Sequence, residues 1–200
     1  MRDVAPFAER AYISPMSSHP RRSAPPTGFV TEEEFLALPE TLNRTELLDG
    51  LIVREPSPGF GHQESVSRLV ADLVYWAKDR APRPDVLSGP LDVRFAPDRI
   101  LQPDVVVFLE PLPRPVAMPI DRVPDLCVEI VSRRHAYDRV TKRLVYANAG
   151  VRELWTVLPK MHLVERWTGP GLADREEMRQ LLTTPLLPGF ELDVEAVGGG

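Results

Sequence analysis

The sequence predicts a mixed α/β fold in which one β-sheet is flanked by helices, with a core order of helix, strand, strand, strand, helix and strand. Apolar residues recur at helical spacing over 62–80 and again over 137–149. Between these helices, 100–109 and 126–131 are short apolar runs of the kind that form buried strands. We expect the first strands to pair antiparallel through tight turns and the second helix to make a crossover connection to the last strand.

Composition indicates one domain of ordinary globular type. Residues 1–28 are rich in proline and serine and lack periodicity, so we expect a disordered or loosely attached tail before a domain over 29–196. No apolar stretch is long enough to cross a bilayer, and we expect no membrane partner. The net charge of −5 argues against a surface coated in basic residues, but allows a local basic patch. The single cysteine, Cys127, excludes a disulfide framework and fits a cytoplasmic protein with a buried thiol.

The domain is expected to begin with a short helix and a hairpin. Thr31-Glu32-Glu33-Glu34 has the pattern of a capping box, in which Thr31 and Glu34 satisfy each other's backbone N–H groups, and Pro39 ends the helix. Asp49-Gly50 lies between apolar runs and predicts a two-residue turn with positive φ at both positions. Residues 45–53 are therefore a predicted hairpin.

Prolines and glycines divide the rest of the chain into short elements. The helix over 137–149 is expected to bury a stripe of Val140, Leu144 and Ala147 and to end at Gly150. The remaining assignments are a loop at 56–61, a strand at 85–95 with a break near Gly89-Pro90, a turn at 96–99, a loop at 110–124, strands at 153–158 and 161–167, a helix or strand at 174–182, and an extended segment at 187–194.

Each of the two buried strands carries one acid. Asp104 stands where the apolar part of the first strand begins, and Glu129 lies within the second. We expect the strands to lie side by side and to hold both carboxylates over one Mg²⁺, which prefers hard oxygen ligands. Such an ion polarises a phosphoryl oxygen and lowers the pKa of a bound water. The competing interpretation, which the residues alone leave open, is that each acid caps a turn or faces solvent.

Lys142 is the candidate cation for this site, because it lies on the helix that follows the strand of Glu129. It would stabilise negative charge on a phosphate or help to activate water. The alternative is a surface ion pair with Asp138, four residues earlier, and the spacing alone favours that pair. The basic residues near Lys142 either face a phosphate backbone or form a solvated helix face. They are Arg133, Arg134, His135, Arg139, Lys142 and Arg143.

Several short motifs occur in order along the chain. They are Glu46-Leu47-Leu48-Asp49-Gly50, Ser57-Pro58 with His62-Gln63, Gln102-Pro103-Asp104-Val105, Pro124-Asp125-Leu126 with Glu129-Ile130-Val131-Ser132, Asp138 with Lys142 and Tyr146, and Ala149-Gly150-Val151 with Glu153-Leu154-Trp155. Their order and spacing resemble the Uma-two-type endonuclease family, the "putative restriction endonuclease" branch of the PD-(D/E)XK nuclease superfamily. The likeness covers roughly residues 30–195.

The resemblance implies a restriction-endonuclease-like core and a Mg²⁺-dependent endonuclease acting on DNA, with Mn²⁺ as a substitute. It implies that Asp104 and Glu129 bind the metal, with the Ile130 carbonyl as a further ligand. The superfamily lysine usually follows the second acid by two residues; Val131 stands there, and Lys142 is the counterpart on the next helix. The other implied site residues are Glu46 as an early acid, His62 and Gln102 as auxiliary residues, and Arg133, Arg134 and Arg139 as phosphate contacts.

Two departures from the family pattern motivate a second hypothesis. Thr45 replaces the usual aromatic residue before the early acid, and Ser132-Arg133-Arg134 replaces Ser-Pro-Ser. The altered loop could change the reach of Lys142, so the alternative function is a non-catalytic nuclease-fold module that binds nucleic acid or a protein. A homodimer through the apolar strands near Trp155 and Trp167 is a further expectation.

Overall fold

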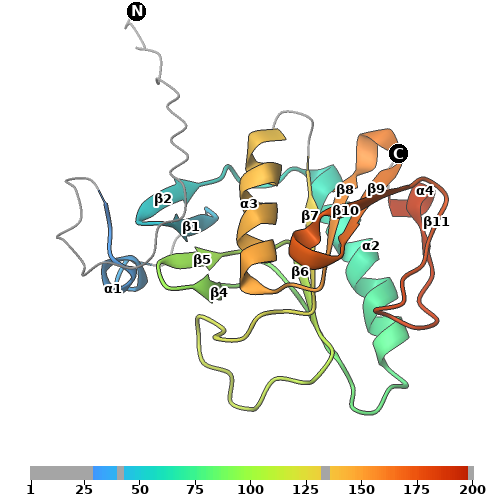
Figure 1. The fold of residues 1–200 in the computed structure, drawn as a ribbon, viewed down its shortest axis with the longest axis horizontal. Helices are drawn as coiled ribbons and strands as arrows, with labels where there is room; N and C mark the ends of the chain where they lie inside the picture. The colour runs from blue at the N-terminus through green and yellow to red at the C-terminus, as the bar shows by residue number, and fades with distance from the viewer. Residues whose placement is uncertain (1–28, 40–42, 132–135, 198–200) are drawn as a thin grey trace, which may run out of the picture.

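A computed structural model describes residues 29–39, 43–131 and 136–197, and confirms the predicted mixed α/β class (Figure 1). The expected tail over 1–28 lies outside the described residues. The helices and strands are α1 (Glu32–Leu36), β1 (Thr45–Leu48), β2 (Leu51–Arg54), α2 (Phe60–Ala77), β3 (Asp85–Ser88), β4 (Val93–Ala96), β5 (Arg99–Leu101), β6 (Val105–Phe108), β7 (Leu126–Ile130), α3 (Ala136–Ala149), β8 (Glu153–Leu158), β9 (Leu163–Thr168), β10 (Asp174–Met178), β11 (Leu181–Leu182), β12 (Leu192–Asp193) and α4 (Val194–Val197).

The larger sheet has the strand order β10-β9-β8-β7-β6-β3. Strands β6 and β7 pair antiparallel, with Val105 opposite Val128, so the two acid-bearing segments are neighbours as predicted. Strands β7 and β8 pair parallel, and α3 makes the expected crossover between them. Two hydrophobic cores cover opposite faces of this sheet. Helix α2 packs on one face through Leu69 and Leu73, and α3 packs on the other through Val145 and Tyr146.

A second sheet, with the order β2-β1-β5-β4, corrects the expectation of one sheet. The predicted strand over 100–109 is divided at Gln102-Pro103-Asp104 into β5 and β6, which belong to different sheets. The predicted strand over 85–95 is divided in the same way into β3 and β4. Each break contains a proline, which has no N–H to donate to a strand ladder. Asp104 therefore lies where the chain passes from one sheet to the other.

The N-terminal helix and hairpin form as predicted. Thr31 caps α1 and the Glu34 side chain accepts from the Thr31 backbone N–H, which completes the capping box. Asp49 and Gly50 have φ values of 51° and 85°, as a type I′ turn requires. Strand β1 then pairs with both β2 and β5, so this hairpin is joined to the strand that leads directly to Asp104.

The buried face of α3 differs from the predicted stripe. Val140 and Leu144 are 53% and 46% exposed, whereas Lys142 is 5% exposed. The apolar spacing was a poor guide here because a lysine can be buried when carboxylates surround it. Lys142, Val145 and Tyr146 thus face the protein interior.

The C-terminal elements complete the larger sheet. The segment 174–182, assigned to a helix or a strand, contains β10 and β11. Trp155 is fully buried and stacks on Phe190 with ring centroids 5.6 Å apart, so it offers no surface for the expected dimer contact. Cys127 is also buried, as predicted. Within the described ranges, no helix is long and apolar enough to cross a membrane.

The hairpin turn gives a test of the fold around the early acid. In Gly50→Ala, a Cβ would lie 2.6 Å from Cδ1 of Phe29 at a φ of +85°. We expect a loss of about 1–2 kcal/mol in the free energy of unfolding, measured by urea denaturation. Gly61→Ala is the control, since its Cβ would meet nothing within 4 Å. It should be neutral or slightly stabilising; equal effects of the two substitutions would contradict the assigned turn.

Candidate active site

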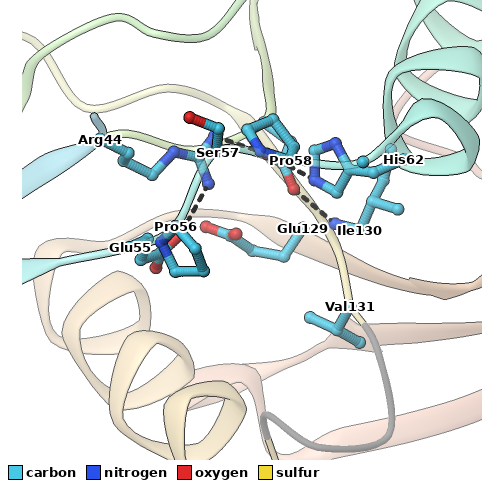
Figure 2. Close-up of a pocket in the computed structure, with 11 residues that line it drawn as sticks. Arg44, Glu55, Pro56, Ser57, Pro58, His62, Glu129, Ile130 and Val131 are labelled. Atoms are coloured by element: carbon cyan, nitrogen blue, oxygen red, sulfur yellow. Dashed lines mark hydrogen bonds and ion pairs between the residues drawn. The ribbon is translucent and has the colours of Figure 1, made fainter. Parts of the chain in front are cut away.

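Asp104 and Glu129 line one pocket of ≈ 230 Å³. Figure 2 shows Arg44, Glu55 and His62 projecting toward the space beside Glu129. The β1–β2 hairpin, the loop before α2, the β5–β6 crossing and the end of β7 all contribute to its wall. The lining residues are Arg44, Glu55, Pro56, Ser57, Pro58, Gly59, His62, Asp104, Glu129, Ile130 and Val131.

Asp104 is 1% exposed and held by three partners. Its Oδ1 lies 2.5 Å from Nη2 of Arg44 and 3.2 Å from Nε2 of His62. Its Oδ2 accepts a hydrogen bond of 2.7 Å from the backbone N–H of Ile130, at the end of β7. Burial raises the pKa of Asp104, but the His62 hydrogen bond and the Arg44 charge outweigh burial and hold this pKa below its ordinary value. Asp104 is thus an ionised, buried carboxylate, and the solvent-facing interpretation is wrong.

Glu129 is buried in a less favourable environment. Its Oε1 accepts a hydrogen bond from the Tyr146 hydroxyl, and its Oε2 lies 3.6 Å from Nζ of Lys142. Burial is the largest cause that raises the pKa of Glu129, and the negative charges of Asp104 and Glu46 raise it further. The charges of Lys142 and Arg44 lower this pKa by less, so it is raised to about 8. The two acids differ because Asp104 has a guanidinium in contact, whereas Glu129 has a more distant ammonium.

Lys142 lies among three carboxylates. Its Nζ is 3.0 Å from Oε1 of Glu46 and 3.2 Å from Oε1 of Glu55, in addition to the contact with Glu129. The spacing favoured a surface ion pair for Lys142. Because Lys142 is buried, that interpretation is wrong. The side chain of Asp138 lies outside the described residues.

Glu46 supports Lys142 from behind the pocket. It is buried, and its Oε1 accepts hydrogen bonds both from Lys142 and, at 2.8 Å, from the backbone N–H of Gln102. Burial raises the pKa of Glu46, while the Lys142 charge lowers it. The Gln102 side chain instead donates to Asp92 at 2.7 Å, so its contribution is through its backbone. Neither Glu46 nor Gln102 belongs to the pocket lining.

Arg44 and Glu55 are site residues that the sequence reasoning missed. Nη1 of Arg44 lies 3.3 Å from Oε2 of Glu55. The hairpin register contains a signal that could have found them: Thr45 pairs with Arg54, so the next residues outward, Arg44 and Glu55, must be opposite each other. Their backbones are indeed joined by a hydrogen bond of 3.0 Å from Glu55 N to Arg44 O.

The predicted phosphate contacts fall outside the described part of the chain. Arg133 and Arg134, together with the side chain of Arg139, lie outside the described residues. Val131, the last described residue before them, lines the pocket.

The charges of the site do not balance. Four carboxylates face two cationic side chains, so full ionisation of these six groups leaves two negative charges in excess. Across the described part of the chain, no three His, Cys, Asp or Glu side chains converge as a ready metal site. Mg²⁺, however, commonly takes one or two carboxylates and retains waters. The carboxylates are Glu46, Glu55, Asp104 and Glu129, and the cations are Arg44 and Lys142.

Two comparisons with known proteins found a match, one to a family model and one to a solved structure. A family model described as Uma2, putative restriction endonuclease, matches residues 32–195. The chain is also similar to a crystal structure described as a putative nuclease belonging to DUF820 from Anabaena variabilis, with a TM-score of 0.72 and 24% identity. That match covers 84% of this chain and 97% of the other, and at this identity it shows the fold alone. A search of curated proteins gave no match.

Removing the ammonium group tests the buried charge cluster. Lys142→Met would leave Glu46, Glu55 and Glu129 facing one another around an apolar side chain, and we expect it to lower the free energy of unfolding by about 3–5 kcal/mol. Lys142→Arg keeps the positive charge and should lower the free energy of unfolding by less. The measurement is urea denaturation at pH 8; a Met variant as stable as the wild type would show that Lys142 does not compensate these carboxylates.

The raised pKa of Glu129 predicts a pH dependence of stability. The folded protein retains a proton on Glu129 up to about pH 8, whereas the unfolded chain releases it near the ordinary value of 4.5. This contribution to stability is therefore present at low pH and is lost as pH rises through that window. We therefore compare Glu129→Gln with the wild type after chelation of metal. Between pH 5 and pH 8, the free energy of unfolding of the variant should rise relative to that of the wild type by on the order of 2 kcal/mol. Asp79→Asn, at a side chain that is 85% exposed, is the control. If the free energies of unfolding of all three proteins changed with pH in parallel, the raised pKa of Glu129 would be refuted.

Proposed function

The chain belongs to the Uma2 family of putative restriction endonucleases, and from this premise we propose that it is a metal-dependent endonuclease that hydrolyses phosphodiester bonds in DNA. Family membership supports a nuclease in general. The observation that carries the finer proposal is the pairing of Asp104 with Glu129 in one pocket, with the Lys142 ammonium directly behind Glu129.

Mg²⁺, or Mn²⁺ in its place, fits the donor set of this pocket. The available donors are hard carboxylate oxygens. Burial raises the pKa of Glu129, the charges of Asp104 and Glu46 raise it further, and a divalent cation at this carboxylate would favour its ionised form. Asp104 and Glu129 would hold the ion, with the Ile130 carbonyl as a further ligand. When bound, such an ion polarises a phosphoryl oxygen and lowers the pKa of a bound water.

The remaining side chains prepare the two acids. Lys142 stabilises the ionised form of Glu129 and supplies positive charge near the negative charge that develops on an attacked phosphate. Glu46 fixes the position of Lys142 through a hydrogen bond of 3.0 Å. The backbone N–H of Ile130 and the His62 ring orient Asp104. We expect His62 to act by orientation, because its Nε2 already contacts the carboxylate.

Cleavage of supercoiled plasmid DNA with Mg²⁺ tests the proposal. Asp104→Asn and Glu129→Gln should each lower the cleavage rate on the order of 100-fold or more, because each loses a negatively charged oxygen ligand. Omission of the metal or addition of EDTA should abolish cleavage. Asp79→Asn, an exposed acid outside the pocket, is the matched control and should retain the wild-type rate.

Two results would contradict the proposal. Full activity of either acid variant would remove that acid from the metal site. A wild-type protein that binds duplex DNA but neither binds Mg²⁺ or Mn²⁺ by calorimetry nor cleaves DNA would instead favour the non-catalytic nucleic-acid-binding module.

A further inference from the structure

The Arg44 guanidinium joins the two sides of the pocket. One terminal nitrogen, Nη2, contacts Oδ1 of Asp104 at 2.5 Å, and the other, Nη1, contacts Oε2 of Glu55 at 3.3 Å. The Arg44 side chain is 14% exposed and belongs to the pocket lining. Burial lowers the pKa of Arg44, but the charges of Asp104 and Glu129 outweigh burial and raise this pKa above its ordinary value. Arg44 is therefore a permanent cation at the carboxylate that the proposed function assigns to the metal.

We propose that Arg44 competes with the divalent cation for Asp104 and, once displaced, binds a phosphate of the nucleic acid. The first half concerns metal binding alone and does not require catalysis. The second half rests on the proposed function. In both halves Arg44 is a switching group: its partner is Asp104 before the metal binds and a substrate phosphate afterwards.

The hydrogen bonds of Asp104 explain why the two cations compete. Its Oδ2 is bound to the backbone N–H of Ile130, which belongs to strand β7 and cannot move away without disturbing the sheet. Its Oδ1 is bound by side chains, those of Arg44 and His62. A metal ion that takes Oδ1 would lie beside the guanidinium, and two cations at one oxygen repel each other. The arginine side chain is the flexible partner, so it is the one that moves.

Glu55 explains where Arg44 goes. Glu55 Oε1 is held by Lys142 at 3.2 Å, while Oε2 holds Nη1 of Arg44. The backbones of Arg44 and Glu55 are also joined in the extension of the hairpin. A guanidinium released from Asp104 therefore stays tethered in the pocket with Nη2 free. Guanidinium groups suit phosphate oxygens because they present several donors in one plane.

Calorimetric titration of the EDTA-treated full chain with Mn²⁺ tests the competition. Arg44→Met removes the competing charge at similar length, and we expect it to bind Mn²⁺ about ten-fold more tightly than the wild type, equivalent to ~1.4 kcal/mol. Arg44→Lys keeps the charge and should remain near the wild type. Arg99→Met is the matched control, because Arg99 pairs with Asp49 outside the pocket. Unchanged or weaker Mn²⁺ binding by Arg44→Met would overturn the competition.

A second measurement keeps the proposal testable if Arg44→Met does not fold. The ¹⁵Nε signal of Arg44 in the wild type, assigned with Arg44→Lys, should shift on addition of Mg²⁺ as the guanidinium leaves Asp104. The Arg99 signal should not shift. An Arg44 signal that stays unchanged while calorimetry reports bound Mg²⁺ would overturn the displacement.

Binding of a DNA duplex in the presence of Ca²⁺ tests the second half. We expect Arg44→Met to bind the duplex about ten-fold more weakly than the wild type, despite tighter metal binding, through loss of a charged phosphate contact. Equal DNA affinity would overturn the phosphate role alone. If the wild type failed to cleave DNA but Arg44→Met tightened Mn²⁺ binding, the nuclease proposal would fail while the competition would stand.

Discussion

The compensation of buried negative charge is the constraint on which the site depends. Lys142 can be buried in α3 only because carboxylates surround it, and those carboxylates come from the hairpin and from β7. The Arg44 guanidinium likewise compensates the negative charge of Asp104 at the crossing between the two sheets. Segments distant in sequence are thus held together by ion pairs whose single members would be costly to bury. The sheets bring the charges near one another, and the face of α3 that carries Lys142 packs toward them.

The unequal charge compensation of Asp104 and Glu129 bears directly on the proposed function. Asp104 has a guanidinium in contact and a lowered pKa, whereas Glu129 has a pKa raised to about 8 by burial and like charges. Strongly perturbed carboxylates lining a pocket are typical of functional sites. A divalent cation would relieve the excess charge, and this is the physical reason for proposing a metal-dependent reaction for this member of the Uma2 family.

Local chemistry made much of the fold predictable, and long-range packing accounts for what was missed. The capping box at Thr31 and the turn at Asp49-Gly50 depend on neighbouring residues, and both were predicted. Pro103 marks the break within 100–109, but the assignment of its two halves to different sheets depends on partner strands distant in sequence. Asp104 and Glu129, which line one pocket, could be selected as candidates from the sequence because each is an acid beside or within an apolar run. The burial of Lys142 was not predicted, because it arises from carboxylates far along the chain.

The central claim is that Asp104 and Glu129 together bind a divalent cation. Anomalous diffraction from a crystal soaked in Mn²⁺ tests this most directly, because it locates the ion independently of any activity. The account predicts one strong peak in the pocket, bonded to an oxygen of Asp104 and an oxygen of Glu129, with Arg44 turned away from Asp104. A Mn²⁺ peak elsewhere, or an empty pocket with the Arg44–Asp104 ion pair intact at saturating Mn²⁺, would contradict it.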